Sequence, residues 1–373
     1  MRRLVQGDVG CGKTVVAACC ALMAIESGFA VALMAPTEIL AEQHYRNFKA
    51  WLDPLGVPVE MQTGSRKTRD ANAGNVRRPA LFIGTHALIE SGFDVPDLGL
   101  VVIDEQHKFG VSQREKLVRK GRYPHLLVMT ATPIPRTLGL TVYGDLDSSV
   151  IDELPAGRQK IRTYIRSTET LPKVYEFIRS RLKEGRQAYV VYPRVEETDG
   201  GNVKAVVAER EHLEAELAPF RVGLLHGRLN PAEKERVAEQ FRRNQVQVLL
   251  ATSIIEVGVD VPNATVMVID NAEQFGLAQL HQIRGRVGRG RHESYCILVA
   301  NPKTPASRQR LRVLEQSTDG FAIAEADLKL RGPGELVGQE QSGMPSFRFA
   351  DLAQDAVLIE RARELAREIL QKK

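Results

Sequence analysis

Short apolar runs alternate along the chain with longer segments in which apolar residues recur at helical spacing. Such short runs are typical of strands buried on both faces of a parallel sheet, and the longer segments are typical of helices that cover the sheet. The alternation therefore predicts an α/β protein with parallel sheets. The expected strands are 30–35, 80–83, 100–103, 126–129, 188–192, 221–225, 246–251, 265–269 and 295–299. The expected helices are 15–26, 37–52, 171–183, 203–217, 231–243 and 351–370.

Local signals refine several of these elements. Thr37 and Asn230 stand where N-cap residues are expected, and Pro231 follows at a first helical position. The segment 66–78 is polar without an apolar period, and we interpret it as a loop or a poorly formed helix. The last helix is amphipathic, and we expect its apolar residues to face a core. These residues are Leu352, Leu358, Ile359, Leu365, Ala366 and Ile369.

The segment 152–158 resembles a linker, and the strand–helix alternation restarts after it. The chain has 373 residues, enough for two domains of ~150 residues and a tail. We therefore expect one α/β domain over 1–150, a second over 151–302 and an extension over 303–373. Only the first unit carries a glycine-rich nucleotide loop, so a nucleotide is expected to bind in the cleft between the two units.

Composition narrows the class of protein. The hydrophobic content of 43% is ordinary for a globular chain. The sequence shows no apolar stretch long enough to span a membrane and no signal peptide. The four cysteines have neither metal-ligand spacing nor a disulfide pattern, which suits a reducing cytoplasm. The net charge of +5 is only weak support for a nucleic-acid partner.

The segment from Gly7 to Thr14 fits the phosphate-loop pattern G-x-x-x-x-G-K-[ST] between a short apolar run, Leu4–Val5, which we expect to be a strand, and a helix. Its glycines let backbone N–H groups surround phosphate oxygens, Lys13 reaches the outer phosphates, and the Thr14 hydroxyl can hold Mg²⁺. The helix that follows directs its positive end at the same anion. The alternative is an ordinary glycine-rich turn. The expected nucleotide-binding residues here are Gly7, Gly10, Cys11, Gly12, Lys13 and Thr14.

Two carboxylates follow the buried strand 100–103. Asp104 and Glu105 stand at its carboxyl end, where open α/β sheets bind ligands. Asp104 is expected to hold the Mg²⁺ shell, and Glu105 to orient and activate the attacking water. The alternative is a pair of solvated acids at a strand end.

Two arginines near the end of the second unit suggest the other half of the site. Arg286 and Arg289 are three residues apart, so one face of a helix can direct both guanidinium groups at one target. Guanidinium groups match phosphate oxygens and can stabilise a phosphoryl group in transfer. The alternative is a basic surface patch for nucleic acid.

These motifs make the chain resemble a superfamily 2 helicase motor. Gly7–Thr14 is similar to motif I, Asp104–His107 to motif II and Gln282–Arg289 to motif VI. Further segments lie between motifs I and VI in the order that the superfamily has them, namely Pro36–Glu38, Gly84–His86, Thr130–Thr132 and Ala251–Asp260. The resemblance implies two RecA-like parallel-sheet domains in tandem, a P-loop NTPase fold, with a small and mostly helical C-terminal extension.

The resemblance narrows to the RecG family of branched-DNA translocases. Thr130–Thr137 and Asp327–Glu335 are shared by RecG and the transcription–repair coupling factor, and the latter segment belongs to a helical hairpin and translocation loop. Gln339–Gly343 and Phe347–Leu352 resemble RecG specifically. The family implies ATP-dependent movement on branched DNA, ATP and Mg²⁺ as cofactors, a cytoplasmic monomer and single-stranded DNA-binding protein as a further partner.

Individual roles are carried over from the family. Gln282 would sense the γ-phosphate, and Gly258 and Asp260 would lie near the ribose or the domain interface. Mg²⁺ would be held by Thr14 and Asp104, partly through water. The expected DNA-contacting and coupling residues are Thr37, Thr85, Thr130, Thr132, Thr252 and Arg331. A basic cluster is expected to add a DNA-facing surface, with a solvated charged face as the alternative. It comprises Arg284, Arg291, Lys303, Arg308, Arg310 and Arg312.

Two departures from the family remain. The chain begins six residues before the phosphate loop, whereas RecG proteins carry an upstream DNA-wedge domain and a glutamine motif, so we expect a fragment or truncated product. The segment 66–79 is shorter than the helix that the family has there.

Two alternative functions are considered. A coupling-factor motor recruited by RNA polymerase is disfavoured by the sequence of 347–352. A nucleotide-gated DNA-binding module without turnover is disfavoured by Lys13 and Glu105 together with Arg286 and Arg289.

Overall fold

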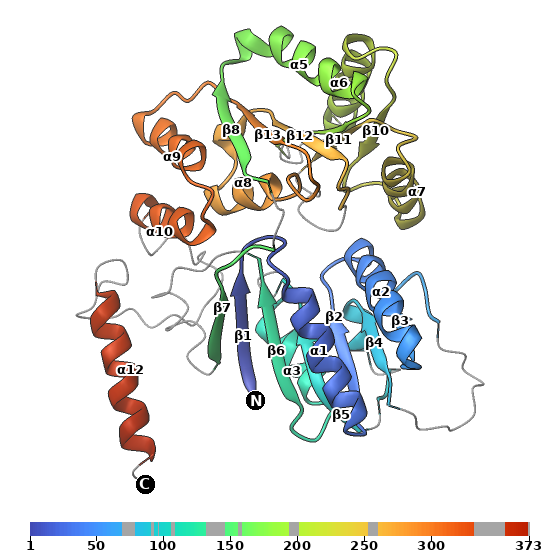
Figure 1. Ribbon diagram of the computed structural model, residues 1–373, viewed down its shortest axis with the longest axis vertical. Coiled ribbons are helices and arrows are strands. Elements are labelled where there is room, and N and C mark those ends of the chain that lie inside the picture. Colours follow the sequence, from blue (N-terminus) through green and yellow to red (C-terminus); the bar gives the residue numbers. More distant parts are fainter. Residues whose placement is uncertain are drawn as a thin grey trace.

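A computed structural model describes residues 1–68, 79–90, 93–95, 97–105, 109–131, 146–155, 159–193, 201–252, 260–331 and 355–371. Two α/β units lie one above the other, each built on a parallel sheet (Figure 1). The described residues contain no helix that is both long and apolar enough to cross a membrane.

The first unit is a seven-stranded sheet in the order β3-β4-β2-β5-β6-β1-β7. All of its neighbouring strands pair in parallel. The strands are β1 (Arg2–Gly7), β2 (Ala30–Met34), β3 (Val59–Gln62), β4 (Leu81–Gly84), β5 (Leu98–Ile103), β6 (His125–Thr130) and β7 (Asp147–Ile151). The helices are α1 (Lys13–Glu26), α2 (Glu38–Leu52) and α3 (Val111–Val118).

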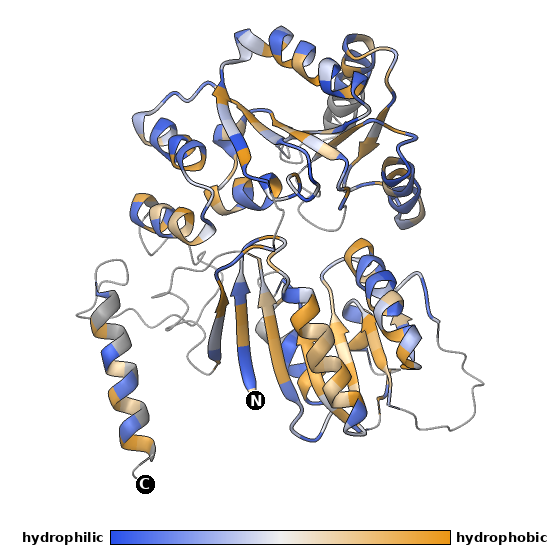
Figure 2. Ribbon diagram, in the orientation of Figure 1, coloured by the Kyte–Doolittle hydropathy of each residue, from blue (hydrophilic) through white to orange (hydrophobic). Residues whose placement is uncertain are grey.

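Apolar side chains bury this sheet on both faces. Successive strand residues alternate between two clusters, as a pleated strand requires. Leu33 and Val102 belong to the cluster under α1 and α2, whereas Met34 and Val101 belong to the cluster on the opposite face. Coloured by hydropathy, several inner strands of the first sheet are mostly orange, whereas a helix such as α2 shows both orange and blue residues (Figure 2).

The second unit is a six-stranded parallel sheet in the order β10-β11-β9-β12-β13-β8. Its strands are β8 (Ile161–Arg166), β9 (Gln187–Tyr192), β10 (Val222–Leu225), β11 (Val248–Thr252), β12 (Ala264–Ile269) and β13 (Ser294–Val299). Its helices are α5 (Leu171–Lys183), α6 (Gly201–Glu216), α7 (Pro231–Arg242) and α8 (Leu277–Arg284). One apolar cluster fills the α5 and α6 face, and another fills the α7 and α8 face.

In the described residues of the C-terminal part, the helices are α9 (Pro305–Gln316), α10 (Gly320–Arg331) and α12 (Ala356–Gln371). Leu311, Leu314 and Ile323 place α9 and α10 in the core of the second unit, next to α8. The expectation that apolar residues of the last helix face a core is wrong for four of them. Leu358, Leu365, Ala366 and Ile369 of α12 are exposed, because α12 stands to one side of both sheets (Figure 1).

Most predicted elements are present within a few residues of the expected limits. Thr37 and Asn230 are the N-caps of α2 and α7, each accepting a backbone N–H bond at its side-chain oxygen. The predicted sheets lacked three strands, β3, β7 and β8, and each of these is an outer strand. Of the segment expected as a loop, 66–68 pairs back on β3 through the bridge Gln62–Lys67, and the remainder lies outside the described residues.

Candidate nucleotide site between the two units

A cavity of about 120 Å³ lies between the two units and is lined from both of them. The first unit contributes the loop after β1, the start of α1, one face of α2 and the ends of β5 and β6. The second unit contributes α8 and the turn that follows it. Most of the residues predicted for nucleotide binding and catalysis line this one cavity. They are Gly10, Gly12, Lys13, Thr14, Asp104, Glu105, Gln282, Arg286 and Arg289.

The phosphate loop is held tightly between β1 and α1. A Cβ on Gly7 would lie 2.4 Å from the Sγ atom of Cys11 and 3.1 Å from the carbonyl oxygen of Ile151, so no larger residue fits there. Gly12 adopts φ 104°, a left-handed conformation that glycine adopts without strain. The Lys13 ammonium is 8% exposed and donates to the carbonyl oxygens of Gly7 (2.7 Å) and Asp8 (2.8 Å).

Asp104 is buried beside the loop and paired with a histidine. The Nε2–H of His44, on α2, donates to Asp104 Oδ2 at 2.8 Å. Burial acts to raise the pKa of Asp104, but the hydrogen bond from His44 and the charges of His44 and Lys13 outweigh it and hold this pKa below its usual range. Asp104 and Thr14 line the same cavity, and a carboxylate with a hydroxyl is an oxygen-ligand set of the kind that Mg²⁺ prefers. No pattern pointed to His44, which lies 60 residues from Asp104.

Glu105 has an unusual backbone and an unusual acidity. Its φ is 49°, and its Oε2 accepts the N–H of Ala131 at 3.3 Å. Burial, and next the charge of Asp104, raise its pKa to about 7, although Lys13, the Ala131 N–H and Arg286 act against this shift. A carboxylate with a pKa near neutral can take up a proton efficiently at physiological pH.

Arg286 and Arg289 do not share a helix face, so that prediction is wrong. Helix α8 ends at Arg284, and Gly285 is its C-cap. Gly288 then turns the chain with φ 78°. Both arginines nevertheless line the cavity from this turn.

The two arginines have different partners. Arg286 is buried, and its burial, followed by the neighbouring charge of Arg289, lowers its pKa to about 10 against the attraction of Glu105 and Asp260. Arg289 is ion-paired with Asp260 and donates from Nε to the Gly285 carbonyl at 3.2 Å. Asp260 therefore contacts a residue of the cavity, Arg289, without lining the cavity itself. Gly258 lies outside the described residues.

Direct bonds join the two units beside the cavity. His281 on α8 lies with Nε2 2.6 Å from Oδ1 of Asp8 in the phosphate loop. Arg46 on α2 is ion-paired with Glu235 (2.6 Å) and Glu239 (3.2 Å) on α7. The site therefore lies across an interface between the two units, and these contacts align one unit with the other.

The sequence comparisons agree with this architecture. A DEAD/DEAH box helicase model matches residues 2–140, a helicase conserved C-terminal domain matches 169–291, and a model for domain 3 of the ATP-dependent DNA helicase RecG matches 317–373. RecG of Synechocystis sp. is 56% identical over 98% of this chain and 45% of its own length, and RecG of Bacillus subtilis is 48% identical over 98% and 54%.

A solved structure of RecG bound to a three-way DNA junction is 44% identical, with a TM-score of 0.75, over 96% of this chain and 47% of that one. The chain belongs to the RecG helicase family. It spans about half the length of the curated relatives that it matches. The tandem parallel-sheet fold and the RecG resemblance are thereby confirmed, and the coupling-factor alternative is not favoured.

The threonines assigned to the DNA track of RecG lie near carboxyl ends of strands. Thr37 and Thr85 follow β2 and β4, and Thr130 and Thr252 end β6 and β11. Thr85 and Thr130 are buried, and the Thr37 side chain accepts the Leu40 N–H at 3.3 Å. Of the two other residues assigned to coupling, Arg331 closes α10 and Thr132 lies outside the described residues.

The expected basic surface is smaller than the sequence suggested. Arg284 is 2% exposed and donates to the carbonyl oxygens of Leu314 (2.7 Å) and Ser317 (2.8 Å), so it is a structural residue of the second unit. Arg310 is half-buried and donates to the carbonyl of Glu273. The members that remain exposed are Arg291, Lys303, Arg308 and Arg312.

Proposed function

We propose that this chain is an ATP-driven motor that moves on branched DNA. The observation that carries the proposal is the convergence of phosphate loop, paired carboxylates and arginines from both units on one cavity. Its volume is below that of pockets that enclose a whole ligand, so it corresponds to the phosphate end of ATP. RecG relatives, described as ATP-dependent DNA helicases, support the assignment.

In this proposal the residues of the cavity have separate roles. The loop N–H groups and Lys13 bind the phosphates, and Thr14 and Asp104 would hold Mg²⁺, which neutralises phosphate charge when bound. Glu105 orients the attacking water and takes its proton. Arg286 and Arg289 stabilise the negative charge that develops during transfer, and Gln282 lies beside them.

Movement on DNA would follow from the two-unit construction. Because the arginines and the phosphate loop belong to different units, ATP favours the closed arrangement and hydrolysis releases it. DNA would then be gripped alternately by the strand-end threonines of the two units, with Arg331 and Thr132 coupling closure to the track. We further propose a monomeric cytoplasmic motor, with single-stranded DNA-binding protein as a partner.

The decisive experiment measures ATP hydrolysis with and without a three-way DNA junction. The unaltered chain should hydrolyse ATP only with Mg²⁺, and the junction should stimulate it. Glu105→Gln should bind ATP normally and lose at least ~10²-fold in turnover, because the amide cannot accept a proton. Nucleotide-dependent DNA binding without hydrolysis by the unaltered chain would instead support a nucleotide-gated binding module.

A further inference from the structure

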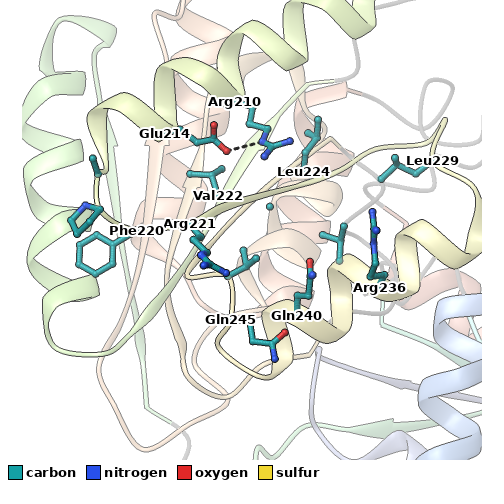
Figure 3. Close-up of a pocket in the computed structure, with 15 residues that line it drawn as sticks. Arg210, Glu214, Phe220, Arg221, Val222, Leu224, Leu229, Arg236, Gln240 and Gln245 are labelled. Atoms are coloured by element: carbon teal, nitrogen blue, oxygen red, sulfur yellow. Dashed lines mark hydrogen bonds and ion pairs between the residues drawn. The ribbon is translucent and has the colours of Figure 1, made fainter.

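A second hollow lies at the β10 edge of the second sheet. It is a groove of about 600 Å³ between α6 and α7, with β10 as its floor (Figure 3). Arg210 and Glu214 stand on the α6 side, and Arg236 and Gln240 stand on the α7 side. The two hollows share no lining residue, so this groove is not used by the proposed ATPase.

The floor of the groove is an open sheet edge. β10 is an outer strand that pairs in parallel with β11. Arg221 accepts the Val248 N–H at 3.1 Å, and residues of a parallel strand alternate in the direction of their backbone bonds. The N–H and C=O groups of Val222 and Leu224 therefore point away from β11. They have no other hydrogen-bond partner among the described residues.

Two of the other outer strands, β8 and β3, have an outward backbone N–H that is bonded by a side chain of the same protein. On β8, the Ile165 N–H donates to Glu315 of α9 at 3.1 Å. On β3, the Met61 N–H donates to Thr68 at 2.7 Å. Proteins usually cover or charge such edges because an open edge recruits a further strand. The contrast marks β10 as an edge available for pairing.

The chemistry of the groove selects the kind of strand. Its apolar surface includes Leu224 and Leu229. Arg210 is ion-paired with Glu214 at 2.8 Å. Arg221 and Arg236 are exposed, and among the described residues neither has a carboxylate partner. The groove thus combines unpaired backbone groups, an apolar floor and two uncompensated positive charges.

We propose that this groove binds an extended segment of a partner protein in which acidic and apolar residues alternate. The segment would add a strand beside β10, with its apolar side chains on Leu224 and its carboxylates at Arg221 and Arg236. Nucleic acid fits less well, because a phosphate backbone offers acceptors only and leaves the carbonyls of Val222 and Leu224 without donors. The proposal is independent of the ATPase assignment.

The test uses the full chain and a fluorescent peptide of about eight residues that alternates aspartate and valine. Two variants separate the two kinds of contact. The double substitution Arg221→Glu with Arg236→Glu reverses the charges, and Leu224→Pro removes one outward N–H while keeping the extended backbone. Lys173→Glu, a charge reversal at an exposed position of α5, is the matched control. Circular dichroism and ATP hydrolysis verify that each variant is folded.

Fluorescence anisotropy should show saturable binding that weakens about tenfold or more in both variants and is unchanged in Lys173→Glu. A peptide of alternating lysine and valine should bind far more weakly. The proposal is overturned if the acidic peptide does not bind up to ~1 mM, or if it binds both variants like the parent. It is also overturned if the arginine variant loses affinity for a labelled oligo-dT and keeps its affinity for the peptide, since the groove would then belong to the DNA track.

Discussion

Glu105 combines partial burial, a left-handed backbone and an acidic neighbour at one position. Each of these features is unfavourable to a folded protein that gains no function from it. Together they place a carboxyl group with a pKa of about 7 beside the phosphate loop. The residue therefore carries the clearest physical signature of a general base in the described part of the chain.

The pKa of Glu105 predicts how ATP hydrolysis depends on pH. Only the ionised carboxylate can accept a proton from water, so kcat/KM for ATP should rise about tenfold per pH unit below pH 7 and level off above it. Steady-state kinetics from about pH 6 to about pH 8 measure this rise in kcat/KM and the plateau above it. The residual activity of Glu105→Gln should show no such rise, and a flat profile for the parent would remove Glu105 from the role of base.

The same residue should cost stability. The folded protein holds the Glu105 proton up to about pH 7, whereas the ordinary pKa is 4.5, so unfolding releases a proton between these values. The contribution of Glu105 to the free energy of unfolding is therefore fully present below the pKa of the unfolded chain, and it is lost as the pH rises through the pKa in the folded protein. Glu105→Gln has no such dependence, so its stability relative to the parent should grow by about 2 to 3 kcal/mol from about pH 5 to about pH 8.

Urea unfolding followed by the fluorescence of Trp51, the single tryptophan, measures this difference in the first unit. Glu90→Gln, at an exposed position of the same unit, is the control and should show no pH-dependent gain. A constant difference between Glu105→Gln and the parent across the pH range would contradict the raised pKa.

Site residues that belong to a local sequence motif could be predicted. Residues that join the site only because the fold brings distant segments together could not. The phosphate loop and the two acids follow local patterns, and they line the cavity. His44 and His281 meet Asp104 and Asp8 across 60 and 273 residues, which no spacing reveals. The burial of Arg284 was also hidden, because charge in a sequence does not say which carbonyl groups will surround it.

At the scale of elements, the strands that escaped prediction share one position. β3, β7 and β8 are outer strands, and a strand with one exposed edge and a partly solvated face needs no continuous apolar run. The sequence of β7, DSSVI, is mostly polar for this reason. The central strands are buried on both faces, so their apolar runs identified them. Hydrophobic pattern thus predicts the middle of such a sheet better than its borders.

Thr37 allows a cap and a DNA contact to be separated. Its hydroxyl caps α2 through the Leu40 N–H, so Thr37→Ala should lower the unfolding free energy by about 1 kcal/mol. Aspartate is a good N-cap but repels phosphate, so Thr37→Asp should keep the stability and weaken DNA binding about tenfold at low salt. Thr37→Ser is the control for both. If Thr37→Asp binds duplex DNA like the parent, the DNA track does not pass this helix.

At the scale of the molecule, two units with separate cores must meet accurately enough to place Arg286 and Arg289 beside the phosphate loop. The contacts that align them include the partly buried pair Asp8–His281 and the more exposed Arg46 with Glu235 and Glu239. Exposed ion pairs contribute only about 0 to 1 kcal/mol, so they can bias closure without locking it. A motor that opens in every cycle requires contacts of this strength.

Arg46→Glu should therefore shift the chain towards an open arrangement. It replaces an attraction to Glu235 and Glu239 with a repulsion, whereas the two glutamates keep Arg242 as a partner and α7 stays folded. An energy change of about 1 kcal/mol corresponds to about a fivefold change in the ratio of closed to open molecules. ATP turnover should fall by up to about that factor, and the radius of gyration in small-angle scattering should increase.

Lys49→Glu is the matched control, because Lys49 lies on the same helix and pairs with Asp53 inside the first unit. It should leave both turnover and the radius of gyration unchanged. The effect of Arg46→Glu should vanish at ~1 M salt, where charges are screened over about 3 Å, and adding Glu235→Arg should partly restore turnover. If the loss of turnover persists at high salt or equals that of Lys49→Glu, Arg46 does not act by holding the two units together, and alignment would rest on other contacts such as Asp8–His281.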